Sequence, residues 1–279
     1  MRTPWRRALA LLVLPVLAAC SGATHARPRT SPVLAPVTSA PAAVVHAAPV
    51  PRDPTVPPLG DAPVLGARGS GARGSRLVRA PRLPGLAGAR GRLVTLTFDD
   101  GPSPEWTPQV LSLLAADHVH AVFCLIGREA AAHPDLVRAI VAGGNALCDH
   151  SRDHDLKMAE QPASYQAAEV EDGLADIRGA DPQAGVRFYR QPGGLWTAPV
   201  LATVRARHLT PLSWDVDPVD WSEPGAAAVV QRVLHQLHPG AYVLMHDGGG
   251  DRSGTVAALR TLLPDLRARH FTVVLPPAA

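Results

Sequence analysis

Two histidines, His150 and His154, stand four positions apart in the stretch His-Ser-Arg-Asp-His. On a helical turn, residues i and i+4 lie on one face, so both imidazoles could bind a single metal ion. Pairs with this spacing are common by chance, and the alternative is two solvated loop histidines. The pair therefore indicates a metal site only if a third ligand is found elsewhere.

A pair of carboxylates can supply that ligand. Asp99 and Asp100 follow the apolar stretch 93–98 and precede Gly101 and Pro102. Adjacent strand residues point to opposite faces, but a Gly-Pro turn can re-aim one of them. One carboxylate could then complete a site of two histidines and one aspartate while the other acts as a base. Three protein ligands leave a position for water, which is typical of a catalytic metal. The alternative is that both acids only form a turn or cap a helix.

Three more polar clusters follow predicted strands. They span residues 190–194 (Arg-Gln-Pro-Gly-Gly), 215–221 (Asp-Val-Asp-Pro-Val-Asp-Trp) and 244–248 (Leu-Met-His-Asp-Gly). Each cluster alone is compatible with an ordinary loop. Asp215 and Asp217 are as well explained by turns and caps as by support of a site.

These clusters would be positioned by alternating strands and helices. Strands are predicted at residues 93–98, 121–126, 145–148, 186–189, 210–216, 241–245 and 271–275. Helices are predicted from Thr107 and at 134–142, 164–178, 198–207, 224–237 and 255–269, the last interrupted near Pro264. Such α/β alternation favours a parallel sheet, and about 190 residues are few for a complete eight-unit barrel of about 250. We therefore expect an irregular, distorted (β/α) barrel of about seven parallel strands, with the chemistry at their carboxyl ends.

In their order and separation, the five segments resemble the polysaccharide deacetylase family (carbohydrate esterase family four, the NodB-homology domain). The family's signatures are Thr-Phe-Asp-Asp-Gly-Pro, His-[Ser/Thr]-x-x-His, Arg-x-Pro-x-Gly, an acid-Trp segment and a final Leu-x-His. They match residues 97–102, 150–154, 190–194, 220–221 and 244–246. The resemblance covers about 185 residues and implies metal-dependent removal of acetyl groups from a polysaccharide.

The resemblance also implies a role for each matching position. The metal ligands would be Asp100, His150 and His154. They would hold one divalent ion, which we expect to be Zn²⁺, although Co²⁺, Ni²⁺ or Fe²⁺ could use the same ligands. The catalytic residues would be Asp99 as base, Arg190 as the group that orients it, His246 as acid and Asp220 as the partner of His246. Substrate would be bound by the Gly193 N–H, which helps to hold the oxyanion, and by Trp221 and Leu244, which line the acetyl pocket.

Two positions depart from the family pattern. Gly193 stands where an aromatic residue, usually Tyr, is frequent, and Trp196 is a candidate substitute for the missing groove wall. Asp149 stands where Asn is frequent before the first histidine. Neither change affects an expected metal ligand or proton-transfer residue, so both bear on substrate specificity rather than on activity.

The first 90 residues differ from the rest. Arg2, Arg6 and Arg7 precede a short apolar stretch that ends at Cys20, which resembles a lipoprotein signal peptide (residues 1–19) with lipidation of Cys20. An ordinary signal peptide is the alternative, and both predict export. Residues 20–90 are rich in Pro, Ala and Arg, with 12 Pro in residues 21–90, and are predicted to be a disordered linker.

Charge and cysteines limit the partners. Residues 91–279 carry 22 acidic against 15 basic residues, so this part is a poor candidate for nucleic-acid binding. The run of three glycines at 248–250 lacks the lysine of a phosphate loop, so no nucleotide site is expected. The basic linker could lie near an anionic envelope surface, or it could reflect codon bias alone. Cys124 and Cys148 could form a disulfide in an exported protein, but buried free thiols are commoner in such segments.

We therefore expect a monomeric, exported hydrolase of N-acetyl groups in an envelope polysaccharide, with peptidoglycan N-acetylglucosamine as substrate and a membrane anchor at Cys20. A chitin-oligosaccharide or acetylxylan deacetylase is the alternative within the same class. A non-catalytic carbohydrate-binding relative would be expected to lack Asp99, Asp100 or His246, all of which are present. An envelope scaffold with a structural metal is disfavoured by the open coordination position.

Overall fold

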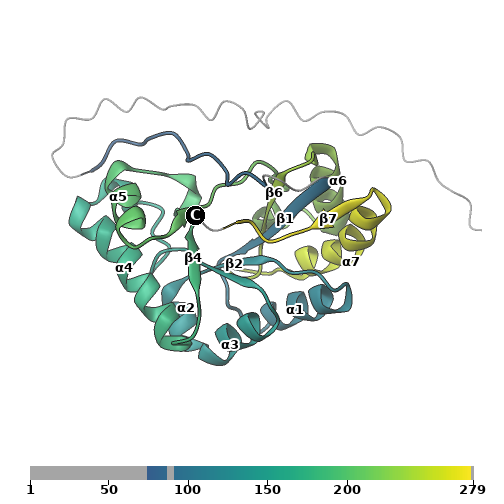
Figure 1. Ribbon diagram of the computed structural model, residues 1–279, viewed down its shortest axis with the longest axis horizontal. Coiled ribbons are helices and arrows are strands. Elements are labelled where there is room, and N and C mark those ends of the chain that lie inside the picture. The colour runs from purple at the N-terminus through teal and green to yellow at the C-terminus, as the bar shows by residue number, and fades with distance from the viewer. Residues whose placement is uncertain (1–73, 87–90, 278–279) are drawn as a thin grey trace, which may run out of the picture. The chain divides into compact units, whose positions relative to one another are not determined.

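The computed structural model of the chain describes residues 74–86 and 91–277 (Figure 1). The predicted signal peptide, Cys20, and linker residues 20–73 and 87–90 lie outside these ranges. The strands are β1 (Arg92–Asp99), β2 (Val122–Leu125), β3 (Ala146–Asp149), β4 (Val186–Tyr189), β5 (Thr210–Pro211), β6 (Ala241–His246) and β7 (Phe271–Val273). The helices are α1 (Thr107–Ala116), α2 (Gly127–Ala132), α3 (Pro134–Ala142), α4 (Ala163–Ala180), α5 (Ala198–Ala206), α6 (Ala226–Gln236) and α7 (Ser253–Ala268). Three short 3₁₀ turns are η1 (Met158–Glu160), η2 (Pro192–Gly194) and η3 (Asp220–Ser222).

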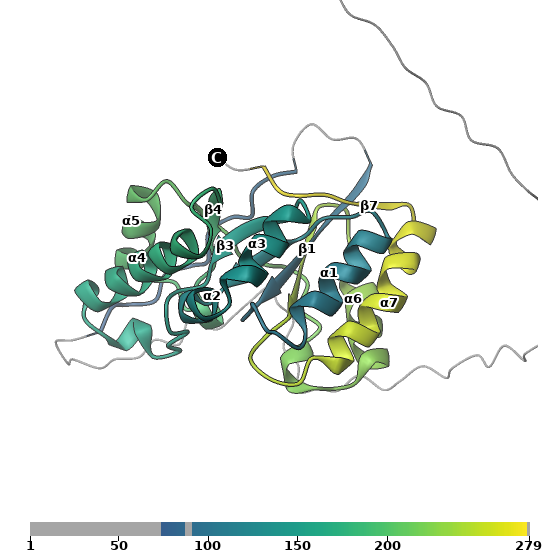
Figure 2. The same cartoon turned by 90° about the horizontal axis from the view of Figure 1, so that it is seen from below.

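The seven strands form one parallel sheet in the order β5-β4-β3-β2-β1-β6, with β7 paired to the first half of β1. The helices lie around the outside of this curved sheet, as Figures 1 and 2 show. The predicted seven-stranded, irregular α/β barrel is therefore confirmed. Because all strands run in the same direction, their carboxyl ends lie at one edge and bring the polar clusters of the sequence together.

The strand predicted at 210–216 is much shorter than expected. Only Thr210 and Pro211 pair with β4, and Pro211 has no N–H to continue the ladder. The chain then changes partner: Leu212 N–H still donates to Tyr189 of β4, whereas Val216 pairs with Val243 of β6. Residues 212–216, here called the seam, therefore connect the two edges of the sheet.

Two helices also differ from expectation. α2 was not predicted, because six residues are too few to show an apolar periodicity. α7 runs without a break through Pro264, where an interruption was expected. Its buried face includes Leu259, Leu262, Leu263 and Leu266, and this packing outweighs the hydrogen bond that proline removes.

Alternation along the strands separates two apolar clusters. Outward-facing residues such as Phe98, Phe123 and Leu147 pack with the helices. Inward-facing residues form a smaller cluster: Val122, Cys124, Ala146, Cys148, Phe188, Leu212 and Tyr242. Thr97 and Asp99 are register partners of Val122 and Cys124, so the site lies on the inner face, above the smaller cluster.

Residues 74–86, here called the strap, lie against the barrel, although the disordered linker was expected to extend to residue 90. Ser75 N–H donates to Ala159 O at 2.7 Å and Val78 N–H donates to Trp196 O at 2.9 Å. Leu83 and Leu86 pack against the inner cluster, and the Tyr242 hydroxyl donates to Pro84 O at 2.7 Å. The expectation of disorder therefore fails for this segment, because these residues bury apolar surface and satisfy backbone groups of the barrel.

Cys124 and Cys148 form a disulfide, so the free thiols that the sequence favoured are not found. The two residues are register partners on β2 and β3 and share the inner face, which brings their Cα atoms to 4.2 Å. The sequence could not decide this, because strand order and register are not visible in residue types. Among the described residues, no helix has both the length and the apolar character needed to cross a membrane.

Candidate metal centre and active site

The site begins at the end of β1. Asp99 is its last residue, and Asp100 adopts a left-handed conformation with φ of 71°, followed by a cis peptide bond between Gly101 and Pro102. This backbone turns the Asp100 side chain toward the same point as Asp99, as the Gly-Pro turn predicted. His150 Nε2 lies 3.5 Å from an oxygen of each carboxylate.

Asp100, His150 and His154 form a candidate set of metal ligands, with one donor atom of each within 4.8 Å of the others. His154 Nε2 lies 3.3 Å from Asp100 Oδ1, a buried oxygen with no hydrogen-bond partner among the described residues. A buried, unpartnered carboxylate oxygen that faces two imidazoles fits a divalent cation.

The protonation of His150 suits this assignment. Burial lowers its pKa to about 3, so the imidazole is neutral and can donate a lone pair. Its Nδ1 lies 2.7 Å from Arg190 O, and this contact orients Nε2 toward the two carboxylates.

The two histidines do not lie on a helical turn, so that part of the prediction is wrong. They belong to a loop after β3 in which Ser151 and His154 have φ of 64° and 54°. The loop is held by hydrogen bonds from Gly127 N–H to Ser151 O and from Arg152 N–H to Glu169 O. The spacing selected a pair that the structure does bring together with Asp100, but through a loop conformation and not through the expected helical turn.

Arg190 fixes Asp99. Its Nη1 donates to Asp99 Oδ1 at 2.6 Å and to Thr97 Oγ1 at 2.9 Å. Nη2 and Nε donate to the seam carbonyls of Ser213 and Leu212. The arginine is fully buried and the exposed fraction of Asp99 is 3 %, so this ion pair has little solvent screening.

His246 lies across from Asp99, because the two residues are register partners on β6 and β1. Its Nδ1 lies 2.7 Å from Asp220 Oδ1, so Nε2 is left to face the site. Burial alone would lower the pKa of His246, but the hydrogen bond and charge of Asp220, with Asp99 and Asp100, raise it to about 9.

Asp220 is held in turn. Its Oδ2 accepts hydrogen bonds from the Thr255 hydroxyl at 2.7 Å and from His246 N–H at 2.9 Å. Although burial opposes ionisation, these donors and His246 lower the pKa of Asp220. The result is a charged carboxylate that keeps the imidazole of His246 protonated at neutral pH.

The three expected substrate-binding residues have different surroundings. Gly193 lies in η2 with φ of 60°, and a Cβ placed there would lie 3.2 Å from Leu156 Cδ2. Leu244 is buried on the inner side of β6, and Trp221 is 55 % exposed in η3, next to Asp220.

Trp196 cannot replace the missing aromatic wall. It is fully buried in the outer core, where its ring packs edge-on against Tyr189. Leu156, which the sequence did not single out, is the exposed apolar side chain beside Gly193. Its position two residues after His154 is visible in the sequence. Its exposure beside Gly193 is not, because that depends on the conformation of the loop.

Sequence reasoning also missed two supporting residues. Asp247 is fully buried and accepts a hydrogen bond at 2.6 Å from Oγ1 of Thr107, the first residue of α1. Burial raises the pKa of Asp247 to about 7. The ring of Trp214 lies 5.6 Å from the Arg190 guanidinium. Asp247 lies within the predicted cluster 244–248 and Trp214 directly precedes the cluster 215–221, but only the tertiary structure shows their contacts.

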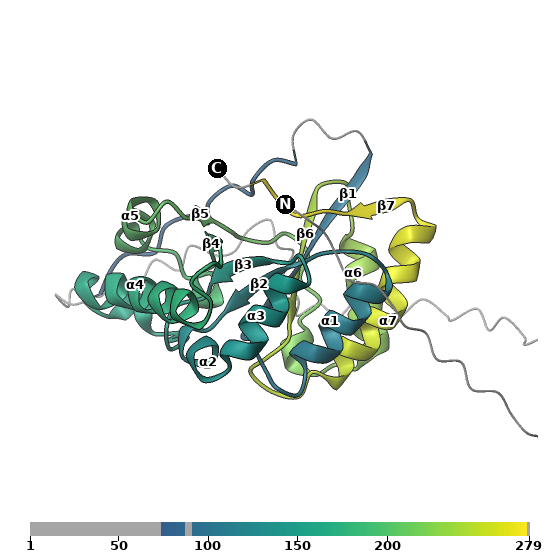
Figure 3. The same ribbon diagram turned by 60° about the horizontal axis from the view of Figure 1, so that its bottom comes forward.

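Asp217 has the turn role that the sequence allowed, whereas Asp215 makes a long-range contact with β6. Asp215 Oδ1 accepts from Tyr242 N–H at 2.8 Å, and Asp217 Oδ1 accepts from Val219 N–H at 2.7 Å. Figure 3 shows that their segment passes between β5 and β6. Both acids therefore stabilise the approach to η3 and neither joins the candidate metal ligands.

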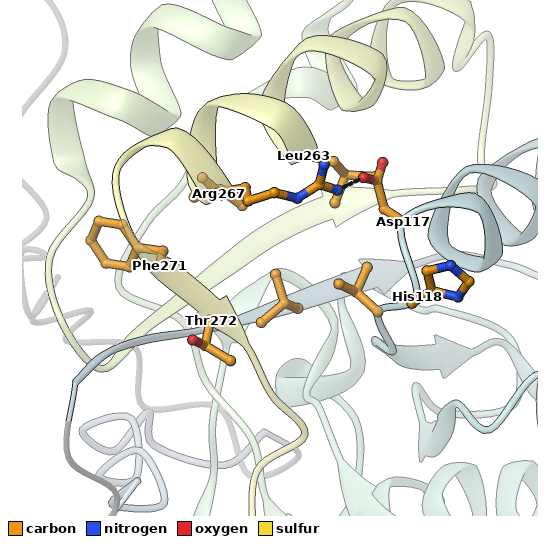
Figure 4. A pocket seen from close by; sticks show the side chains of 9 residues that line it. Asp117, His118, Leu263, Arg267, Phe271 and Thr272 are labelled. Atoms are coloured by element: carbon orange, nitrogen blue, oxygen red, sulfur yellow. Dashed lines mark hydrogen bonds and ion pairs between the residues drawn. The ribbon is translucent and has the colours of Figure 1, made fainter.

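A hollow of about 200 Å³ lies elsewhere, between α1, α7 and β7. Figure 4 shows its lining, which includes an ion pair between Asp117 and Arg267, with His118 and Phe271 beside them. It contains none of the predicted site residues and lies toward the amino ends of β1 and β2. The chemical groups of the site are therefore confined to the carboxyl edge.

Comparison with known proteins agrees with this geometry. The family model described as polysaccharide deacetylase matches residues 87–212. A chitooligosaccharide deacetylase of Bradyrhizobium sp. is 43 % identical over 194 residues, which cover 65 % of this chain and 88 % of the relative. A peptidoglycan-N-acetylglucosamine deacetylase of Bacillus cereus is 35 % identical over 185 residues, covering 66 % and 85 %.

Among solved structures, a family-four pseudoenzyme of Bacillus anthracis is similar with a TM-score of 0.63 and 28 % identity, covering 71 % of this chain and 68 % of that one. Fold similarity therefore extends to a protein described as a pseudoenzyme, and the residues at the site must decide whether this chain is catalytic. By sequence and by structure, the chain belongs to the polysaccharide deacetylase family.

Proposed function

We propose that the protein hydrolyses N-acetyl groups of peptidoglycan N-acetylglucosamine. The observation that carries this proposal is the position of Asp99 and His246 as register partners on adjacent strands, beside the three candidate metal ligands. A base and an acid thus flank one point where an acetamide carbonyl can be placed. The similarity to the peptidoglycan-N-acetylglucosamine deacetylase from Bacillus cereus supports the choice of substrate.

A divalent ion held by Asp100, His150 and His154 would polarise the carbonyl and lower the pKa of bound water. We propose Zn²⁺, because two neutral imidazoles and one carboxylate are ligands that it prefers in catalytic sites. The low pKa of His150 keeps that ligand available without competition from protons at neutral pH.

Asp99 and His246 carry out the proposed proton transfers. Asp99 accepts a proton from the attacking water as the new C–O bond forms at the acetamide carbon. The Gly193 N–H would donate to the developing oxyanion, while Trp221 and Leu244 would contact the acetyl methyl. His246 Nε2–H then donates its proton to the nitrogen as the C–N bond breaks, which releases acetate and a free amine.

Arg190 and Asp220 would act as positioning residues. The short contact of Arg190 with Asp99 fixes one carboxylate oxygen and leaves the other free to face His150. Asp220 fixes the tautomer and charge of His246. Because Arg190 follows β4 and Asp220 lies in η3, each proton-transfer group is held from a second element, and the two keep a defined separation across the site.

Chitin oligosaccharides are a second candidate substrate. The chitooligosaccharide deacetylase of Bradyrhizobium sp. has higher identity, 43 %, than the peptidoglycan deacetylase of Bacillus cereus, 35 %. Both relatives are described as deacetylases of N-acetylated sugars, so the same site could serve either substrate.

Acetate release tests the proposal. The full-length protein would be stripped of metal by a chelator, resupplied with Zn²⁺ or Co²⁺, and given peptidoglycan fragments, chitin oligosaccharides or acetylxylan. We expect metal-dependent release that Asp99→Asn abolishes, with the fastest turnover on peptidoglycan fragments. If a folded, metal-loaded sample released acetate from none of them, the proposal would be wrong, and faster release from chitin oligosaccharides would favour the second candidate.

We further propose that the protein is exported and anchored to the membrane by a lipid on Cys20, which would place it near peptidoglycan. The support is the sequence alone: a basic start, a short apolar stretch and a cysteine after small residues. Metabolic labelling with a fatty acid should mark the native chain and not the Cys20→Ser variant. Equal labelling of both would exclude this anchor.

A further inference from the structure

Large apolar side chains are rarely exposed in the described part of the chain. Those that are exposed are Leu77 (40 %), Val78 (37 %), Leu156 (55 %), Tyr165 (38 %) and Trp221 (55 %). Trp221 belongs to the site already described. The other four come from the strap and from the segment 156–165.

Leu156 connects this group to the site. It follows the candidate ligand His154 by two residues, and its Cδ2 lies 3.2 Å from the place of a Cβ on Gly193. The loop is anchored close by, because Met158 is fully buried and its sulfur accepts from Gln191 Nε2 at 3.4 Å. Leu156 is therefore held at the surface beside the site.

The strap extends the same surface. Ser75 N–H bonds to Ala159 O, three residues after Leu156, and the Ser75 hydroxyl accepts from Gln166 Nε2, next to Tyr165. Leu77 forms a bridge with Thr197, and Val78 bonds to Trp196, close to Gly193 in sequence. The strap thus places Leu77 and Val78 against the two segments that carry Leu156, Tyr165 and the proposed oxyanion donor Gly193. Figure 1 shows the strap running past α5 and the end of β4.

We propose that Leu77, Val78, Leu156 and Tyr165, here called the track, bind sugar residues of the substrate chain that are remote from the one being deacetylated. The inference rests on the proposed function and adds to it a subsite contributed by the strap, which lies outside the residues matched by the family model. Pyranose rings combine apolar C–H faces with a rim of hydroxyl groups, so they suit a narrow apolar strip bordered by polar groups.

The surroundings of the track favour a sugar over an acyl chain or a protein. Exposed Arg76 and Arg79 flank the two strap residues, and Asp155 and Lys157 flank Leu156. A lipid or protein interface of this size would bring these charges into an apolar environment at a cost. A glycan can instead form hydrogen bonds with them while its ring faces contact the apolar side chains.

The track predicts that activity depends on chain length. The test compares the full-length, metal-loaded protein with Leu77→Ser/Val78→Ser and with Leu156→Ser, on the dimer and the hexamer of β-1,4-linked N-acetylglucosamine. Arg82→Ser, an exposed residue further along the strap, is the matched control. The serine variants keep the backbone hydrogen bonds of the strap, and equal melting temperatures would show that the fold is retained.

We expect kcat/KM on the hexamer to fall about tenfold through a rise in KM, since loss of about 1.4 kcal/mol of binding is one factor of ten. On the dimer, the kcat/KM of the serine variants should stay unchanged. The Arg82→Ser control should keep the wild-type kcat/KM on both the dimer and the hexamer. An equal loss on dimer and hexamer, or no loss on either by an active enzyme, would overturn the track. If the wild-type protein deacetylated neither oligomer, chitin oligosaccharides would be excluded as substrates, and the same comparison on short and long peptidoglycan fragments would decide the track.

Discussion

Asp99 and Asp149 end two strands of the same sheet, β1 and β3, and both are buried, but they face opposite sides. On the inner face, Asp99 is paired with Arg190, whose Nη1 donates to Asp99 Oδ1 at 2.6 Å. On the outer face, Asp149 lies against Gly173 of α4, and neither of its oxygens has a hydrogen-bond partner among the described residues.

The surroundings change the chemistry of the same functional group. Burial raises the pKa of Asp149 well above its usual range; the nearby Ser151 N–H opposes this without hydrogen-bond geometry, and the charge of Glu169 adds to it. A carboxyl in this position favours its neutral form. Arg190 instead holds one oxygen of Asp99, and the other oxygen faces His150. The face of the strand on which an acid lies therefore separates a catalytic role from a structural one.

The largest expected effect concerns the inner acid. Asp99→Asn removes the proposed base and should lower kcat/KM for acetate release by about 10²–10⁴-fold. Asp149→Asn is the matched control at the end of the other strand and should keep activity within a small factor. The measurement is steady-state kinetics at saturating metal. Comparable losses of kcat/KM in the two variants would contradict the assignment of a catalytic role to the inner acid and a structural role to the outer one.

The next effect is on stability. Arg190→Met leaves Asp99 buried without its cation, and we expect the free energy of unfolding to fall by about 3–5 kcal/mol. Adding Asp99→Asn should recover part of this loss, because the unpaired charge is then gone. Urea unfolding of both single variants and the double variant gives the coupling energy, and strict additivity would show that the ion pair contributes little.

The outer acid should behave in the opposite way. Because the folded-state pKa of Asp149 is raised, the native state keeps a proton that the unfolded chain releases above about pH 4. Stability is then lost as the pH rises toward the folded pKa. Asp149→Asn should therefore stabilise the protein by about 1–3 kcal/mol at pH 8, with the gain shrinking toward pH 4. A constant difference across this pH range would contradict the assignment.

A third carboxylate sharpens the comparison, since Asp220 is buried, fully hydrogen-bonded and charged. With it, the pKa of His246 is raised to about 9, so the acid is protonated below that pH and activity should decline as the pH rises through it. Asp220→Asn should move this alkaline limb about one to two units lower. The measurement is kcat/KM against pH, and an unmoved limb would show that another group controls it.

The sequence predicted the strand ends well, because their composition and spacing are local. Once β1 and β6 are parallel and adjacent, Asp99 and His246 must meet, and the family signatures indicate that adjacency. The left-handed conformation of the loop at His154 and the exposure of Leu156 depend on tertiary contacts such as Met158 with Gln191. The disulfide depends on register in the same way. The strap was missed because its composition resembles a linker, and only its docked backbone shows otherwise.

The seam has a consequence for motion. Few backbone hydrogen bonds hold residues 212–216 between the two edges of the sheet, from Leu212 to Tyr189 and between Val216, Tyr242 and Leu244. The same five residues supply the carbonyl oxygens of Leu212 and Ser213 that accept from Arg190. A local opening of the seam therefore also releases the Arg190 guanidinium, which fixes one carboxylate oxygen of Asp99. Amide hydrogen exchange at Leu212, Val216 and Leu244 should report how often the enzyme leaves its competent arrangement, without unfolding of the rest.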